Sequence, residues 1–169
     1  MGGFRESLRC RTRVARTKTD SKEHMTQIET RYSQTPAFQA GVEARGSVLG
    51  VDVVDKALNS ADDFNQAMQQ LTTEYCWGTI WTRAGLPKST RSLLNIAMLT
   101  ALNRSKELET HIKGALVNGC TVSEIQEVLL QAAVYCGVPA GIEGFRVASP
   151  VVKAHLEARV DQAPGKEPK

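Results

Sequence analysis

The chain has 169 residues, of which 41% are hydrophobic and 23% charged, and its formal net charge is +3. This length suits one domain with its own core, and the composition excludes collagen-like and wholly disordered proteins. The positive charge is concentrated in residues 1–24, which carry seven basic and three acidic side chains, whereas the remainder is slightly acidic. A nucleic-acid binder carries basic surface on its folded domain, so the sequence predicts no nucleic-acid partner.

Four cysteines lie far apart, at Cys10, Cys76, Cys120 and Cys136, without a Cys-x-x-Cys pair or a neighbouring His cluster. This spacing predicts neither a metal site nor a dithiol redox centre, and a reduced intracellular compartment is expected. The sequence also has no run of 18 apolar residues, which predicts no membrane span. We expect a cytoplasmic protein, with a mitochondrial location as the alternative because the N-terminal segment is basic.

Both ends of the chain lack apolar periodicity. Residues 1–30 are rich in Arg and Thr and are expected to form a disordered basic N-terminal extension. Two origins stay open for it: a mitochondrial transit peptide, or a non-native upstream extension with Met25 as the effective start. Residues 161–169 are expected to form a disordered tail, which leaves one domain at residues 31–160.

Apolar residues between the ends recur at helical spacing. The first stripe predicts one long amphipathic helix, along Val54, Ala57, Leu58, Ala61, Phe64, Met68, Leu71 and Tyr75. Gly85-Leu86-Pro87 then breaks the chain, and Ser89 or Thr90 is expected to cap the next helix. That helix is apolar almost all round over residues 93–102, so we expect it to be buried on every side.

Three further helices follow. The first is predicted to begin near Ser105 and end at Asn118-Gly119, with His111 bordering its buried stripe of Leu108, Ile112, Ala115 and Leu116. Thr121 and Glu124 form a capping box for the second, which is expected to end at a buried Cys136. The last runs to about Arg159 with a kink at Pro150. The absence of any long strand pattern predicts an all-α single domain.

Three stretches resemble the carboxymuconolactone decarboxylase family. They are Trp77–Arg83 leading into GLPKSTRSLLNIAML, then ELETHIKGALVNG, and then EIQEVLLQAAVYCGVPA. The resemblance extends from Arg31 to Leu156, and ordinary helices have no reason to share these motifs in this order. It implies a helical bundle of the alkyl hydroperoxidase D-like type, with about six helices. It also implies a homo-oligomer, commonly a hexamer or trimer.

The family resemblance also implies a cofactor-free decarboxylase acting on a carboxymuconolactone or a related small unsaturated or aromatic-derived carboxylic acid, in the breakdown of aromatic compounds. His111 is the expected acid or base, because its ordinary pKa lies near physiological pH. Glu124 is the second candidate catalytic residue. Arg83, Arg91 and Arg146 are candidates to hold substrate carboxylates, since a guanidinium offers a planar fork of donors.

Other interpretations of these residues remain open. Glu124 is explained by its capping box alone, and a lone His beside an apolar face is often structural. Family members commonly read Ala-Asn-Ser-Ala-Phe-His after Val-Pro-Ala, where this chain reads Gly141–Arg146. Trp77 and Trp81 are expected in the core or an interface rather than as a stacking platform, and Glu143 can pair with Arg146 at one helical step.

Three functional alternatives therefore accompany decarboxylation: an isomerase or lactone-handling enzyme, a hydroperoxide-related activity, and a non-catalytic oligomeric binding protein. The peroxidase relatives use a Cys-x-x-Cys motif, and Pro139 stands here at the position of its second Cys. Peroxide reduction by a pair of cysteines is therefore not available by that mechanism. A pocket holding both His111 and an Arg would favour catalysis, and a His111 packed without a cavity would favour the binding protein.

Overall fold

The structure is a computed structural model that describes residue 28 and residues 30–161. The predicted N-terminal extension and C-terminal tail therefore fall almost wholly outside the described residues. The predicted domain boundaries at residues 31 and 160 stay a prediction.

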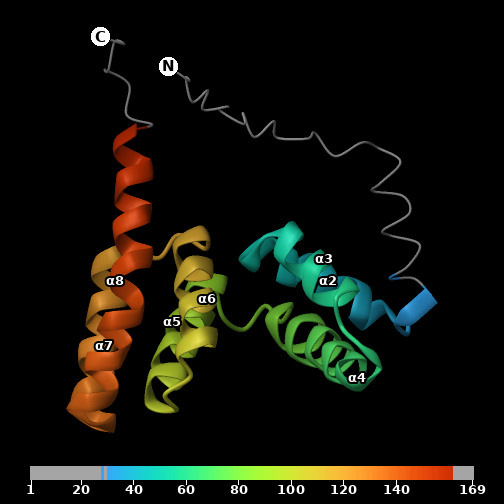
Figure 1. The fold of residues 1–169 in the computed structure, drawn as a ribbon, viewed down its shortest axis with the longest axis horizontal. Coiled ribbons are helices and arrows are strands. Elements are labelled where there is room, and N and C mark those ends of the chain that lie inside the picture. The colour runs from blue at the N-terminus through green and yellow to red at the C-terminus, as the bar shows by residue number, and fades with distance from the viewer. Residues whose placement is uncertain (1–27, 29, 162–169) are drawn as a thin grey trace, which may run out of the picture.

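All regular elements in the described part of the chain are helices, which confirms the predicted all-α fold class (Figure 1). Seven α-helices and one π-helix are present, and no strand occurs among these residues. In chain order they are α2 (Pro36–Leu49), α3 (Val51–Asn59), α4 (Asp63–Leu71), the π-helix η1 (Thr72–Trp81), α5 (Lys88–Ala101), α6 (Ser105–Val117), α7 (Val122–Cys136) and α8 (Val138–Asp161). We call residues 30–81 the N-terminal unit and residues 88–161 the C-terminal bundle.

Helix α2 packs against η1 at main-chain distance. Thr35 caps α2 by accepting a hydrogen bond from the Phe38 amide at 3.1 Å. A Cβ added to Gly41 would lie 1.9 Å from the Thr73 carbonyl oxygen, and one added to Gly78 would lie 1.8 Å from that of Ala37. The two helices therefore approach this closely only because both positions are glycine.

The predicted long helix over residues 54–75 is wrong, because the chain breaks after Asn59. Asp62 starts a new helix by accepting a hydrogen bond from the Asn65 amide at 2.8 Å. The apolar stripe divides with it: its first part is buried at Val54, Leu58 and Ala61, and its second part is exposed at Phe64, Met68, Leu71 and Tyr75. Apolar period alone does not reveal this break, since the spacing continues through it.

The C-terminal bundle has its own core, made by side chains of α5 to α8 and the α6–α7 turn. The core residues are Ile96, Leu108, Ile112, Ala115, Cys120, Ile125, Leu129, Ala148 and Val151. Helix α6 has the predicted bounds and is followed by Gly119 at φ 86°. The capping box of Thr121 and Glu124 is also confirmed at the start of α7.

Other expectations for this bundle are wrong. Pro87 precedes α5 as its cap residue without a side-chain bond, so neither Ser89 nor Thr90 caps it. Helix α5 is also not buried on every side, because Leu94 and Met98 are exposed on it and Leu102 is exposed directly after it. Cys136 is exposed rather than buried. Helix α8 contains Pro150 and continues to Asp161, and the kink expected at Pro150 stays a prediction.

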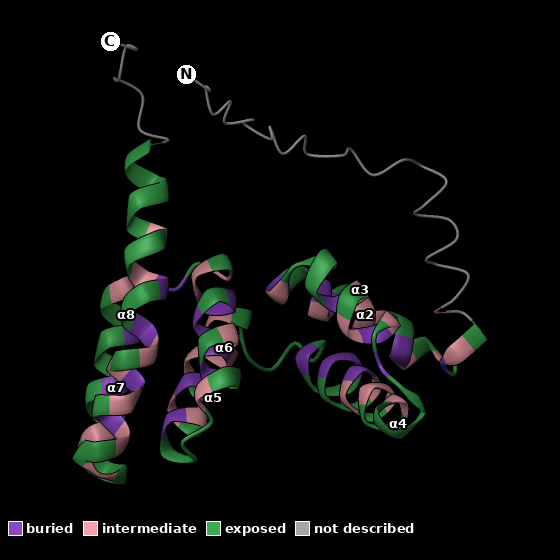
Figure 2. Ribbon diagram, in the orientation of Figure 1, coloured by how far each residue is buried: buried purple, intermediate pink, exposed green. Residues whose placement is uncertain are grey.

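The two units have separate cores. Buried side chains of the N-terminal unit gather in a cluster around Phe38 and Leu58 and in another formed by Val48, Trp77 and Trp81. Figure 2 shows that buried residues occur in both units. The units meet where α2 contacts α6 and where the Lys88 ammonium donates to the Ser47 hydroxyl at 2.9 Å.

Candidate active site

His111 lies at this junction of the two units. It projects from α6 and is half-buried, three residues before Gly114. A Cβ on Gly114 would lie 2.8 Å from Cγ1 of Val48, so α6 comes close to α2 here. The small residue at 114 thus lets the C-terminal bundle present His111 to the N-terminal unit.

Two tryptophans of η1 form the opposite wall. The Trp77 and Trp81 rings stack on each other with centroids 4.6 Å apart, and both are buried. The imidazole of His111 lies parallel to Trp77, with centroids 6.1 Å apart and an interplanar angle of 1°. Its centroid is 6.3 Å from that of Trp81. The tryptophans are core residues, as expected, and they also bound the surroundings of the candidate catalytic residue.

The polar partner of His111 is Asn95 on α5. Its Nδ2 lies 3.4 Å from Nδ1 of His111. Asn95 is half-buried and stands one helical turn after Arg91, so both project from the same face of α5. His111 is therefore held between an aromatic wall from one unit and an amide from the other.

Burial lowers the pKa of His111 below its ordinary value of 6.5. The Glu107 carboxylate, one turn earlier on α6, acts in the opposite direction with a smaller effect. The imidazole is accordingly neutral at physiological pH. A neutral ring has one N–H to donate and one lone pair to accept with.

Arg91 and Arg83 lie together at the entry to α5. Nη2 of Arg91 donates to the main-chain carbonyl of Arg83 at 2.9 Å. Nε of Arg91 is buried and has no hydrogen-bond partner among the described residues. Arg91 thus keeps a donor that the described protein does not use, on the face of α5 that also carries Asn95. The Arg83 side chain is exposed.

The structure gives Glu124 and Arg146 other partners. The Glu124 carboxylate accepts from the Thr121 amide at 2.7 Å and from its hydroxyl at 2.8 Å, and these bonds lower its pKa. Arg146 forms an ion pair with Glu143, which also accepts from the Ser105 hydroxyl at 3.1 Å. Ser105 is the first residue of α6, about 9 Å along the helix axis from His111. Among the described residues, no hydrogen bond or ion pair joins Glu124 or Arg146 to His111, and their roles in a site stay predictions.

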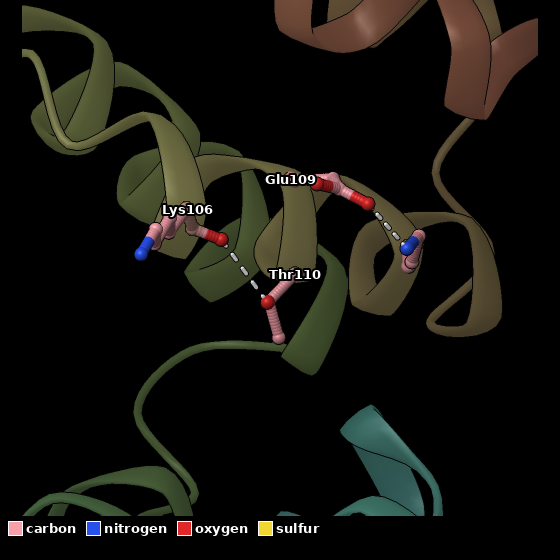
Figure 3. A network of polar contacts seen from close by, with 4 residues as sticks. Lys106, Glu109 and Thr110 are labelled. Atoms are coloured by element: carbon pink, nitrogen blue, oxygen red, sulfur yellow. Dashed lines mark hydrogen bonds and ion pairs between the residues drawn. The ribbon is translucent and has the colours of Figure 1, made fainter.

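The outward face of α6 is polar and exposed (Figure 3). There Lys113 forms an ion pair with Glu109 at 2.6 Å, and the Thr110 hydroxyl donates to the Lys106 carbonyl at 3.2 Å. These groups are satisfied locally and are typical of a solvated helix face.

Two surface hollows lie elsewhere. One of about 420 Å³ is lined by apolar side chains of α6 and α8 with Lys113 and His155, and the other, of about 510 Å³, includes Ser105, Cys136 and Glu143. Neither is lined by His111. These two hollows therefore give no support to a pocket at His111, and the case for catalysis rests on the contacts of His111 and on relatedness.

Asn95 is the site residue that sequence reasoning missed. It interrupts an otherwise apolar run, and a polar residue amid Leu93, Leu94 and Ile96 signals that its amide needs a hydrogen-bond partner.

Among the described residues, no group of His, Cys, Asp and Glu side chains is arranged to hold a metal ion. No helix in the same part of the chain is long and apolar enough to cross a membrane.

Comparison with known proteins agrees with the motifs around this site. Residues 66–150 match the model of the carboxymuconolactone decarboxylase family. The chain is 40% identical over 116 residues to 4-carboxymuconolactone decarboxylase of Acinetobacter baylyi, which covers 69% of this chain and 87% of that protein. It is 44% identical over 110 residues to nitrosuccinic acid decarboxylase npaB of Metarhizium robertsii, covering 65% of this chain and 77% of that protein. The chain belongs to the carboxymuconolactone decarboxylase family.

Proposed function

We propose that this protein is a cofactor-independent decarboxylase of a small carboxylic acid, with His111 as its catalytic residue and Arg91 as a carboxylate-binding residue. A carboxymuconolactone is the first candidate substrate. The observation that carries the proposal is the half-buried His111 between Trp77, Trp81 and Asn95 in a chain of this family.

The two relatives narrow the substrate class. Both are named as decarboxylases, one for a carboxymuconolactone and the other for nitrosuccinic acid. An unsaturated lactone and a nitro group share one property, which is that each can accept the electron pair left on carbon when carbon dioxide departs. We therefore expect an acid that carries its own electron-accepting group, so that no cofactor has to supply one.

Substrate binding, exclusion of water and stabilisation of the developing charge are assigned to different residues. Arg91 has an unused donor at Nε for a substrate carboxylate, and a charged donor makes the stronger kind of hydrogen bond. The Trp77 and Trp81 rings keep water away from one side of His111, which strengthens electrostatic interactions there. His111 then faces the part of the substrate on which negative charge develops.

The test is carbon dioxide release from 4-carboxymuconolactone and from nitrosuccinic acid by the purified full-length protein. We expect turnover of at least one acid and its loss in His111→Gln. His155→Gln is the matched control, because His155 is a half-buried histidine on α8, in a different part of the bundle. Background rates with both acids contradict the proposed substrate class, and a fully active His111→Gln variant contradicts the role of His111.

We further propose that the protein is a homo-oligomer, a hexamer or trimer as in the family resemblance. The support is the second part of the apolar stripe, on α4 and η1, where Phe64, Met68, Leu71 and Tyr75 are 90%, 61%, 57% and 59% exposed. A contiguous apolar surface of this kind is typical of an interface. Light scattering after size exclusion should show a smaller species for Phe64→Glu. Gln126→Glu, which adds the same charge at an exposed position of α7, should leave the mass unchanged.

A further inference from the structure

The contact between Asn95 and His111 bears on which imidazole nitrogen carries the proton. The Asn95 atom nearest the ring is Nδ2, 3.4 Å from Nδ1 of His111. An amide nitrogen only donates hydrogen bonds, so with the Asn95 amide in this orientation Nδ1 offers its lone pair. The single proton of the neutral ring is then on Nε2. This tautomer leaves an N–H group, rather than a lone pair, on the free edge of the imidazole.

The groups around His111 agree with a neutral ring. Glu107 is the charged group on its own helix, and Arg91 stands one turn before Asn95 on α5. On α2, Arg45 is turned to Gln69 and Thr73, with distances of 2.9 and 3.0 Å. On α8, Glu143 is occupied by Arg146 and by the Ser105 hydroxyl. None of these carboxylates accepts a hydrogen bond from Nδ1, the partner that would favour a charged ring.

We propose that Asn95 is a positioning residue that holds His111 as a neutral Nε2–H donor, and that this N–H binds the enolate or nitronate oxygen formed as carbon dioxide leaves. The inference rests on the proposed decarboxylation and replaces acid or base catalysis by His111 with hydrogen-bond donation. An imidazolium would point its Nδ1–H at the amide N–H of Asn95. Two donors would then face each other, so the charged form requires the amide to rotate.

The step balances without a net change in His111. The carbon–carbon bond to the carboxylate breaks, and its electron pair moves through the conjugated system onto the accepting oxygen. Carbon dioxide leaves, and Nε2–H stabilises the new oxyanion without giving up its proton. Water then supplies the proton that reaches carbon and is left as hydroxide. Because the ring ends as it began, it needs no reprotonation between turnovers.

The tautomer can be observed without substrate by ¹⁵N NMR of the imidazole nitrogens. The chain contains three histidines, and His111→Gln identifies the signals of residue 111. We expect the Nε2–H form in the parent protein. Asn95→Asp replaces the donor with an acceptor, so the proton should move to Nδ1 and the pKa should rise by about one unit or more. Asn95→Leu, similar in size but without a donor, should give a mixture of tautomers.

The pKa has a second readout in the protein itself. Its two tryptophans are Trp77 and Trp81, both within 6.3 Å of the imidazole centroid. A protonated imidazole quenches indole emission, so the pH at which fluorescence falls should move upward in Asn95→Asp. Gln126→Glu is the matched control because it adds the same charge on an exposed position of α7, and its midpoint should stay at the parent value.

Steady-state kinetics, combined with the observed tautomer, distinguishes failure of the Asn95 inference from failure of the proposed decarboxylation. Loss of the oriented donor should lower kcat by roughly 10²-fold in Asn95→Asp and Asn95→Leu, mainly without raising KM. An Nδ1–H ring in the parent protein overturns the inference, as does an Asn95→Asp variant with unchanged tautomer and kcat. The expected tautomer in a protein that turns over neither acid supports the positioning by Asn95, and it contradicts the catalytic role together with the proposed function.

Discussion

Gly78→Ala tests how strictly the contact between α2 and η1 determines the site. The new Cβ would lie 1.8 Å from the Ala37 carbonyl oxygen and 2.7 Å from its carbon. Both are main-chain atoms, so no side chain can rotate away. An ordinary contact would require the helices to separate by about 1.5 Å or more. Overpacking typically costs about 1–3 kcal/mol, and we expect the upper end of this range or more because the obstacle is backbone.

Urea unfolding followed by tryptophan fluorescence measures this cost. A loss of about 3 kcal/mol corresponds to a fall of roughly 1–3 M in the urea midpoint for a small protein. Gly85→Ala is the matched control, because its added Cβ meets nothing within 4 Å. The control should keep the parent midpoint or exceed it slightly. If Gly78→Ala unfolds at the parent midpoint with unchanged emission, the argument for a backbone contact between α2 and η1 is refuted.

Three further predictions concern the candidate site residues. Because burial lowers the pKa of His111, the folded state binds this proton less tightly than the unfolded state, and stability should fall as the pH drops from above about 6.5 towards the folded pKa. Urea midpoints at about pH 7.5 and about pH 5.5 should therefore differ less in His111→Gln than in the parent. Arg91→Lys removes the free Nε donor and should raise KM by roughly tenfold with little change in kcat, which steady-state kinetics measures; an unchanged KM would exclude Arg91 from substrate binding. Glu124→Gln preserves a capping box, so thermal unfolding should remain within about 0.5 kcal/mol of the parent, and a large fall in kcat would then establish catalysis by Glu124.

Features of the fold that depend on residues close together in the sequence were predictable. The capping box of Thr121 and Glu124 and the helix end at Gly119 depend on bonds within a few residues, and both are present. The break after Asn59 was not predictable from apolar period, because the stripe continues across it. The exposed faces of α4 and α5 were missed because composition shows which side chains are apolar and not how much surface one subunit can cover.

The candidate site was partly predictable, since the family motifs single out His111 and Arg91. The residues that surround His111 were not predictable, because they come from distant parts of the sequence and meet only in the tertiary structure. Trp77 reaches the imidazole through the contact of η1 with α2, which Gly41 and Gly78 permit from positions 37 residues apart. Asn95 could have been suspected as a lone amide in an apolar helix, but its partner is 16 residues away on another helix.

The separation of the two cores affects how the protein loses activity. His111 and Asn95 belong to the C-terminal bundle, and Trp77 and Trp81 belong to the N-terminal unit, so the proposed site exists only while both are docked. Local opening of the N-terminal unit would dismantle the site while the C-terminal helices stay folded, since their core contains no residue from it. On heating, inactivation should therefore begin below the temperature at which helical circular dichroism is lost. Substitutions intended to slow thermal inactivation should accordingly stabilise the interface between the two units before they stabilise either core.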